Sequence, residues 1–437
     1  MNQSSEQILL ADLTWTGSRF ERDVAVHVDA NGVIARVVPA KHAEEGRTTR
    51  LSGRALLPGM VYAHSHAFQR ALRNRPERFD TGQGNFWTWR DTMYRLVEGL
   101  TPESMYEISR QCFAEMLRAG VTSVGEFHYV HHVGDSDWAF DDALLAAARD
   151  AGIRMRLIQC FYATGGIGKP LAGAQRRFDA LSLDAFIAQL ERLPSKLDPV
   201  TQSLAIAAHS IRAASIENIA RLYEAAGAMD LPFHIHVEEQ RQEIADCVAS
   251  HGTRPLRLML DRLPIDDRFT AIHCTHSEAD DLRELFARGG GVCLCPSTEG
   301  NLADGIPKLD VMRSSGARVA IGSDCNLRLC MSEDLRWLEY AQRLTKERSG
   351  NVVDEQGRVG PALFELATVN GAAALRLAVG SIAAGRLADF FTIDVNHPSL
   401  MGADAESLMH AFVFGCGNGP IDQVWVGGRT TVAADRR

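Results

Sequence analysis

The middle of the chain alternates short apolar runs with amphipathic helical stretches, and this alternation restricts the possible folds more than any other feature. Two of the helical stretches, 103–120 and 141–152, end in glycine, which commonly terminates helices. The apolar runs, each short enough for a strand buried on both faces, are 61–66, 123–129, 155–161, 204–209, 233–237, 270–273, 292–295 and 319–323. Eight strand–helix units predict an α/β protein with a (β/α)₈ barrel.

A doubly wound open sheet is the alternative, because it is also built from strand–helix units. Such a sheet commonly carries G-x-G-x-x-G after its first strand. The sequence has no such motif after residues 61–66. The barrel is therefore the favoured prediction.

Both ends of the chain have a residue pattern that differs from that of the middle. Apolar residues alternate on either side of a turn at residues 29–32, which ends in Asn-Gly, a hairpin signal. Near the other end, 381–395 and 423–432 are also expected to be strands with glycine-rich turns. We therefore predict a small β-sandwich domain assembled from residues 1–57 and 382–437, and a barrel domain over residues 58–381.

Composition and charge exclude several classes of function. Hydrophobic residues make up 46% of the 437 residues and charged residues 23%, as in ordinary globular proteins. The net charge is −9 and Lys and Arg do not cluster, which argues against nucleic-acid or anionic-membrane partners. The N-terminus does not resemble a signal peptide, and no apolar stretch is long enough to span a membrane. Nine cysteines without a C-x-x-C pair indicate reduced thiols and a cytoplasmic location.

Histidine and aspartate residues at the ends of these runs predict a metal site. His64 and His66 are two residues apart, so a strand would present both to the same face. In a barrel the first and eighth strands are neighbours, and the fifth lies across the mouth, which brings His236 and Asp324 to the same point. Three imidazoles and one carboxylate suit a catalytic Zn²⁺ ion, and also Fe²⁺ or Mn²⁺. His234 remains an alternative to His236.

Two further residues are candidates for proton transfer. Glu239 follows His236 by three residues and His273 ends the sixth run, so both are expected at the same mouth. Because Glu238 and Glu239 are adjacent, we expect one of them to face solvent.

These motifs resemble those of known enzymes. The H-x-H, H-x-x-E, histidine and aspartate pattern, with the segments LLPGMVYAHSH and GSIAAGRLADF, resembles the mononuclear deaminases of the amidohydrolase superfamily. Within that superfamily, FWTWRDTMYRL, EFHYVHH, HIHVEEQ and STEGNLADGI resemble segments of the formimidoylglutamate deiminases of histidine degradation. The resemblance covers essentially the whole chain.

The resemblance implies an activity and a role for each site residue. The reaction would be hydrolysis of N-formimino-L-glutamate to N-formyl-L-glutamate and ammonia, carried out by a homodimer. The implied zinc ligands are His64, His66, His236 and Asp324. The implied catalytic residues are Glu239, His273 and Asp324, and the residues implied to bind the small anionic substrate are Gln69, Arg90, Tyr129, His209 and Arg212.

Physical chemistry agrees with these residue types, because a dianionic substrate requires arginine and neutral donors. Three positions depart from the family pattern: Cys325 and Asn326 stand where Ser-His is usual, and Ala303 stands where glycine is usual. They leave open a deaminase of the same superfamily that acts on a ring amidine or a guanidino acid. A catalytically silent homologue is the other alternative, although all six positions of the metal and proton-transfer set are present.

Overall fold

The computed structural model describes residues 6–42, 48–73, 86–134 and 137–433. Its central feature is an eight-stranded parallel sheet in chain order, in which each strand pairs with the next. The strands are β6 (Met60–Ser65), β7 (Val121–His128), β8 (Arg154–Phe161), β9 (Gln202–Ala208), β10 (Phe233–Val237), β11 (Phe269–His273), β12 (Gly291–Leu294) and β13 (Arg318–Ile321). This order confirms the predicted barrel over the doubly wound alternative.

The first and last strands meet where they end. Ser65 and Asp324 form a parallel bridge, the backbone N–H of His66 donates to the Asp324 carbonyl over 2.9 Å, and the N–H of Ser323 donates to the His64 carbonyl over 2.9 Å. This seam between β6 and β13 closes the barrel directly beside the predicted metal ligands.

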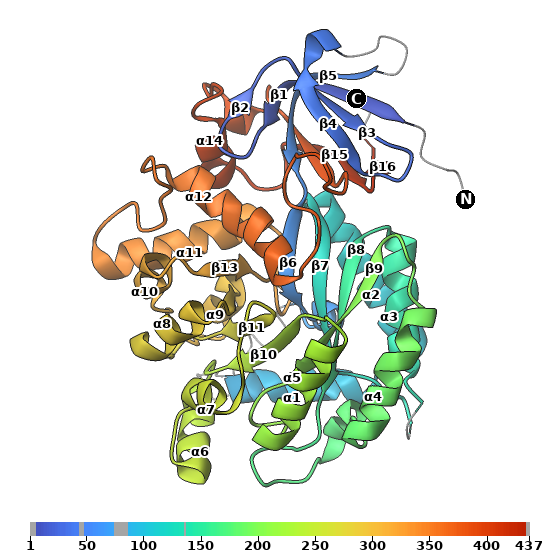
Figure 1. Ribbon diagram of the computed structural model, residues 1–437, viewed down its shortest axis with the longest axis vertical. Helices are drawn as coiled ribbons and strands as arrows, with labels where there is room; N and C mark the ends of the chain where they lie inside the picture. The colour runs from blue at the N-terminus through green and yellow to red at the C-terminus, as the bar shows by residue number, and fades with distance from the viewer. Residues whose placement is uncertain (1–5, 43–47, 74–85, 135–136, 434–437) are drawn as a thin grey trace.

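Both ends of the chain form a separate mixed sheet, seen as blue and red strands at the top of Figure 1. Its strands are β1 (Gln7–Trp15), β2 (Phe20–Glu21), β3 (Val24–Val28), β4 (Ile34–Pro39), β5 (Thr48–Pro58), β14 (Phe390–Asp394), β15 (Ile421–Val426) and β16 (Arg429–Val432). The hairpin around residues 29–32 is confirmed by the antiparallel pairing of β3 with β4. The division into domains at residues 57/58 and 381/382 stays a prediction.

One predicted strand is shorter than expected. Of residues 381–395, only β14 is a strand. The preceding segment turns at Gly385, whose φ of +82° is a conformation that favours glycine. The Gly385 N–H then donates to the Ile34 carbonyl over 2.8 Å, so this segment lies against β4 as a loop.

Helices connect and cover the barrel strands. They are α1 (Phe86–Glu98), α2 (Pro102–Arg118), α3 (Ala139–Ala151), α4 (Leu183–Arg192), α5 (Ile216–Ala228), α6 (Arg241–His251), α7 (Pro255–Arg262), α8 (Ala279–Ala287), α9 (Pro296–Asn301), α10 (Leu309–Ser314), α11 (Met331–Lys346), α12 (Val359–Glu365), α13 (Gly371–Ala374) and α14 (Leu408–Gly415). Residues close in the chain start α2: Thr101 and Ser104 form a capping box, and Pro102 begins the first turn. α3 ends at Gly152 in the left-handed conformation, as its sequence predicts.

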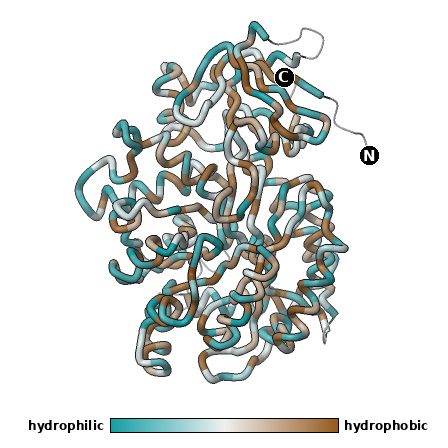
Figure 2. The backbone as a smooth tube through the Cα atoms, in the orientation of Figure 1, coloured by the Kyte–Doolittle hydropathy of each residue, from teal (hydrophilic) through white to brown (hydrophobic). Residues whose placement is uncertain are grey.

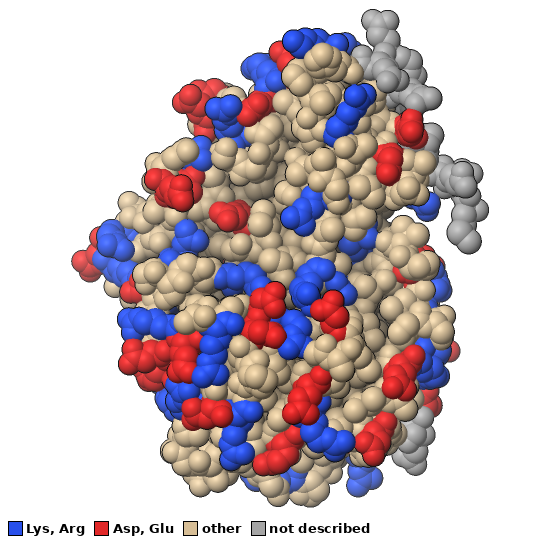
Figure 3. Space-filling model, viewed as in Figure 1, with Lys and Arg blue, Asp and Glu red and all other residues tan. Residues whose placement is uncertain are grey.

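Hydrophobic residues concentrate along the inner strands, whereas hydrophilic residues follow the outer loops and helix faces (Figure 2). On the face in Figure 3, acidic and basic side chains are interspersed and do not form a patch of one sign. None of the helices in the described residues has the length and apolar character that a membrane span requires.

Candidate metal centre and active-site cavity

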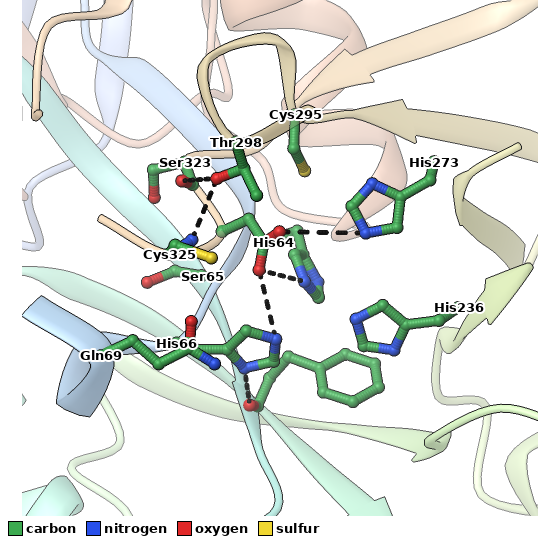
Figure 4. A network of polar contacts seen from close by, with 12 residues as sticks. His64, Ser65, His66, Gln69, His236, His273, Cys295, Thr298, Ser323 and Cys325 are labelled. Carbon is green, nitrogen blue, oxygen red and sulfur yellow. Dashed lines mark hydrogen bonds and ion pairs between the residues drawn. The ribbon is translucent and has the colours of Figure 1, made fainter. Parts of the chain in front are cut away.

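The predicted ligands come together at the C-terminal ends of three barrel strands. Donor atoms of His64, His66 and His236 lie within 4.8 Å of one another. Asp324 Oδ1 lies 3.5 Å from His64 Nε2 and 3.4 Å from His66 Nε2. In Figure 4 the rings of His64, His66, His236 and His273 surround one point.

The hydrogen bonds of these histidines leave nitrogen lone pairs for a metal. Nδ1 of His66 lies 2.8 Å from the Phe127 carbonyl, and Nδ1 of His236 lies 2.9 Å from the His209 carbonyl. Because a carbonyl oxygen only accepts hydrogen bonds, each Nδ1 carries the proton, and the lone pair of each Nε2 is available to a metal. Neither ring nitrogen of His64 has a hydrogen-bond partner among the described residues. The set therefore fits a divalent metal.

Burial and the contacts among these groups set their charges. It lowers the pKa of His66 to about 3 and that of His236 well below its ordinary value. Burial raises the pKa of Asp324, but contacts with His64 and His66 outweigh it and hold the pKa below the ordinary value. Neutral imidazoles and an ionised carboxylate are the protonation states that metal binding requires.

His234, the alternative ligand, does not belong to this group of donors. It is buried inside the barrel, and neither of its ring nitrogens has a hydrogen-bond partner among the described side chains. The geometry favours His236.

His273 and Glu239 lie beside the ligand group. His273 Nε2 is 3.9 Å from Glu239 Oε1 and 3.8 Å from Asp324 Oδ2, while its Nδ1 lies 3.2 Å from Glu299 Oε1. Burial lowers the pKa of His273, but Glu239, Glu299 and Asp324 together raise it to about 10. The backbone here is left-handed, with φ of +72° at His273 and +50° at Asp324, a strain typical of functional sites.

A cavity opens in front of these groups, and all five residues predicted to bind substrate line it. Gln69 Nε2 donates to the Tyr129 hydroxyl over 3.0 Å, which leaves Gln69 Oε1 without a partner among the described residues. The cavity is lined by His66, Gln69, Phe86, Trp89, Arg90, Met93, Tyr94, Tyr129, Tyr162, Phe178, His209, Arg212, His236, Glu239, His273, Leu302, Asp324 and Cys325.

The two arginines of the cavity are held differently. Arg212 Nη2 lies 3.6 Å from Glu239 Oε2, and its Nε lies 3.0 Å from Glu243 Oε2. Arg90 lies over the rings of Trp87 and Tyr94, with its Cζ atom 4.4 and 5.4 Å from their centroids. Both therefore bring positive charge to a cavity whose metal end is acidic.

A second histidine cluster is a hydrogen-bonded network. His128 Nε2 and His131 Nδ1 lie 2.9 and 3.0 Å from Asp141 Oδ1, and the amides of Gln159 and Gln189 donate to Asp141 Oδ2 over 2.6 and 2.7 Å. These are hydrogen-bond distances, shorter than the 3.4–3.8 Å separations around Asp324. The cluster therefore ties β7 to α3 and α4.

One expectation is wrong, and the structure places the residues that depart from the family pattern. Glu238 does not face solvent: it is buried, like Glu239, and accepts the Leu256 N–H over 3.2 Å. Asn326 is buried and does not line the cavity, whereas Cys325 does. Ala303 has a φ of +57°, which explains why glycine suits that position.

Residues 55–431 match the amidohydrolase family. The chain belongs to the amidohydrolase family. This amidohydrolase is 40% identical over 423 residues to the formimidoylglutamate deiminase of Pseudomonas aeruginosa, covering 95% of this chain and 92% of that protein. The crystal structure of an amidohydrolase from Brucella melitensis has a TM-score of 0.89 and 30% identity, covering 98% of this chain and 95% of that one.

A crystal structure of an adenosine deaminase from Xanthomonas campestris with bound zinc is also similar, with a TM-score of 0.81, 26% identity and coverage of 98% and 93%. The amidohydrolase family is metal-dependent, and the groups of histidine and aspartate in this chain fit that property. The family match and the similarity to a deiminase and a deaminase show that this chain is a hydrolase that acts on C–N bonds.

Sequence reasoning missed several residues of this amidohydrolase site. Glu299 contacts His273, and Glu243 contacts Arg212 from the first turn of α6. Glu299 lies within the family-like segment STEGNLADGI, and Glu243 lies four residues after Glu239, but neither position by itself indicates a partner. Trp89, Tyr94 and Tyr162 were missed because a single aromatic residue is more often part of a core.

Proposed function

We propose that this amidohydrolase hydrolyses the formimino C=N bond of N-formimino-L-glutamate, giving N-formyl-L-glutamate and ammonia. The observation that carries the proposal is that Arg90 and Arg212 line the same cavity as the predicted metal donors. Two guanidinium groups match a substrate with two carboxylates. The 40% identity to the Pseudomonas aeruginosa enzyme supports the same reaction.

We propose Zn²⁺ as the metal, held by His64, His66, His236 and Asp324. A bound zinc ion would lower the pKa of a coordinated water to about 7 and so supply a nucleophile at neutral pH. The imidazole and carboxylate donors suit zinc, and the zinc in the similar adenosine deaminase structure supports this choice over Fe²⁺ or Mn²⁺, which the same donors also suit. The homodimer and the cytoplasmic location stay predictions.

The side chains divide the proton transfers. One proton of the attacking water passes to Asp324 as the water oxygen bonds to the formimino carbon. His273 is already protonated at neutral pH, because its acidic neighbours raise its pKa to about 10, so it can return a proton but not accept this one. Glu239, whose pKa burial raises, carries a proton to the imino nitrogen. The proton of the new hydroxyl group then passes to the same nitrogen, and ammonia leaves as the C=O bond forms and the C–N bond breaks. Glu299 fixes the ring of His273 through Nδ1, so that Nε2 faces Glu239 and Asp324.

A ring amidine is the competing substrate class, and the aromatic lining of the cavity is the observation that favours it. Phe86, Trp89, Tyr129, Tyr162 and Phe178 offer faces on which a base could stack. A ring substrate, however, leaves Arg90 and Arg212 without carboxylates to bind. We therefore favour the acyclic dicarboxylate.

The test is ammonia release by the zinc-loaded protein from three compounds. N-formimino-L-glutamate is the proposed substrate, N-carbamoyl-L-glutamate keeps both carboxylates but lacks the imine, and adenosine supplies a ring amidine. Release from the formimino compound alone is expected. Release from adenosine alone would contradict the proposal, and so would the absence of release from all three compounds.

A further inference from the structure

Asn326 occupies the seam that closes the barrel. Its side chain is fully buried and does not line the cavity. Oδ1 accepts the Ser323 hydroxyl over 2.7 Å, and Nδ2 donates to Ser65 Oγ over 3.1 Å and to the Asp324 carbonyl over 3.0 Å. One amide therefore joins the end of β6 to the turn after β13.

The contact with Ser65 continues to a third strand. Ser65 stands between His64 and His66 and pairs with Glu126 of β7. Ser65 Oγ accepts from Asn326, and Glu126 Oε1 accepts the Ala67 N–H over 2.6 Å. His66 is therefore held through the residue before it and the residue after it.

The turn that carries Asp324 needs such support. Asp324 and Asn326 have φ values of +50° and +54°, in the left-handed region. Residues other than glycine rarely adopt this conformation unless their surroundings hold it, although Asp and Asn adopt it more readily than most because their side chains bond locally. A relaxed turn would move the Asp324 carboxylate away from His64 Nε2 and His66 Nε2.

We propose that Asn326 is a positioning residue that, through Ser65, holds the H-x-H pair and Asp324 at the separation that binds the metal. Asn326 sets metal affinity and does not contact substrate. The inference rests on the metal centre of the proposed function and is independent of which amidine is hydrolysed.

The test compares Asn326→Gly with Asn370→Ala. Glycine adopts a positive φ freely, so the variant removes the amide without straining the turn. Asn370 is the matched control because its Nδ2 also donates to a backbone carbonyl, that of Val319 over 3.1 Å, at the end of β13 away from the seam. The apoproteins are titrated with Zn²⁺ in competition with a chromogenic chelator, and urea unfolding is measured in parallel.

Asn326→Gly is expected to weaken zinc binding by about 10- to 100-fold, the range for residues that orient metal ligands, while Asn370→Ala stays close to wild type. With zinc at saturation, KM is expected to remain near the wild-type value. A folded Asn326→Gly protein with wild-type zinc affinity would overturn the inference, as would a raised KM with zinc affinity intact.

Ser65→Ala provides a second variant if Asn326→Gly does not fold, because it removes the hydroxyl that accepts from Asn326. It is also expected to weaken zinc binding, and wild-type affinity would overturn the inference. Wild-type protein that binds no zinc would overturn the metal centre as well. The titration contains no substrate, so an error in the proposed substrate does not affect it.

Discussion

Nδ1 of His236 lies 2.9 Å from the backbone carbonyl oxygen of His209, and the two rings stack with centroids 4.7 Å apart. The carbonyl fixes the tautomer that leaves His236 Nε2 as a donor to a metal. The ring of His209 meanwhile lines the cavity. One residue at the end of β9 therefore orients a predicted metal ligand and faces the predicted substrate.

Replacing each of the two histidines of β10 by alanine tests which of them binds the metal. His236→Ala is expected to lose zinc and ammonia release together, because it removes one of four donors. His234→Ala is expected to keep one zinc per chain while losing some stability, because it leaves a buried cavity. Metal analysis of the dialysed proteins measures both. A full zinc content in His236→Ala would assign the ligand to His234.

Adjacent glutamates provide a similar comparison for proton transfer. Glu239→Gln is expected to lower kcat by about 10²- to 10⁴-fold with zinc retained, because the amide does not carry a proton. Glu238→Gln is the control: Glu238 is equally buried but faces Arg254 Nη2 at 3.4 Å, outside the cavity. Steady-state kinetics of the two zinc-loaded variants measure the difference. Equal losses of kcat would contradict the role of Glu239.

Substrate binding by Arg212 is testable through KM. Arg212→Lys keeps the charge but loses the planar fork, so KM for N-formimino-L-glutamate is expected to rise about 10- to 100-fold, the worth of one hydrogen bond to a charged group. Arg254→Lys changes a partly buried arginine outside the cavity and is the control. A KM that responds equally in both variants would exclude specific carboxylate binding by Arg212.

The Asp141 network predicts loss of stability in acid. Burial raises the pKa of Asp141, but the charges and hydrogen bonds of His131 and His128 hold it below the ordinary value. A carboxylate with a depressed folded pKa stabilises the fold above its unfolded pKa of about 4, and this stability is lost as the pH falls below that value. Burial also lowers the pKa of His128, so its contribution is lost as the pH falls below about 6.5.

Asp141→Asn is therefore expected to reduce the free energy of unfolding by about 3–5 kcal/mol at pH 7, as for a broken buried ion pair, and by less near pH 3. Asp142→Asn is the matched control, because its exposed pair with Lys196 is worth at most about 1 kcal/mol. Urea unfolding at the two pH values measures both. A deficit in Asp141→Asn that grows in acid would contradict the assignment.

Local patterns in the sequence were enough to predict the barrel strands and the residues that meet at the predicted metal site. An H-x-H pair at a strand end fixes two side chains on one face, since alternate residues of a strand point the same way. The glycine after α3 likewise ends that helix through its own backbone conformation. These features depend on residues close in the chain, so periodicity and spacing predict them.

Tertiary structure decided the features that depend on residues far apart in the chain. Glu299 meets His273 across 26 residues, and Asn326 meets Ser65 across 261. Likewise, only packing against Leu256 and Arg254 shows that Glu238 is buried away from the cavity. The sequence by itself determined which side chains have the chemistry to bind a metal or to transfer protons. Closure of the barrel determined which of them share one site, because contact through space depends on the register of strands that are distant in sequence.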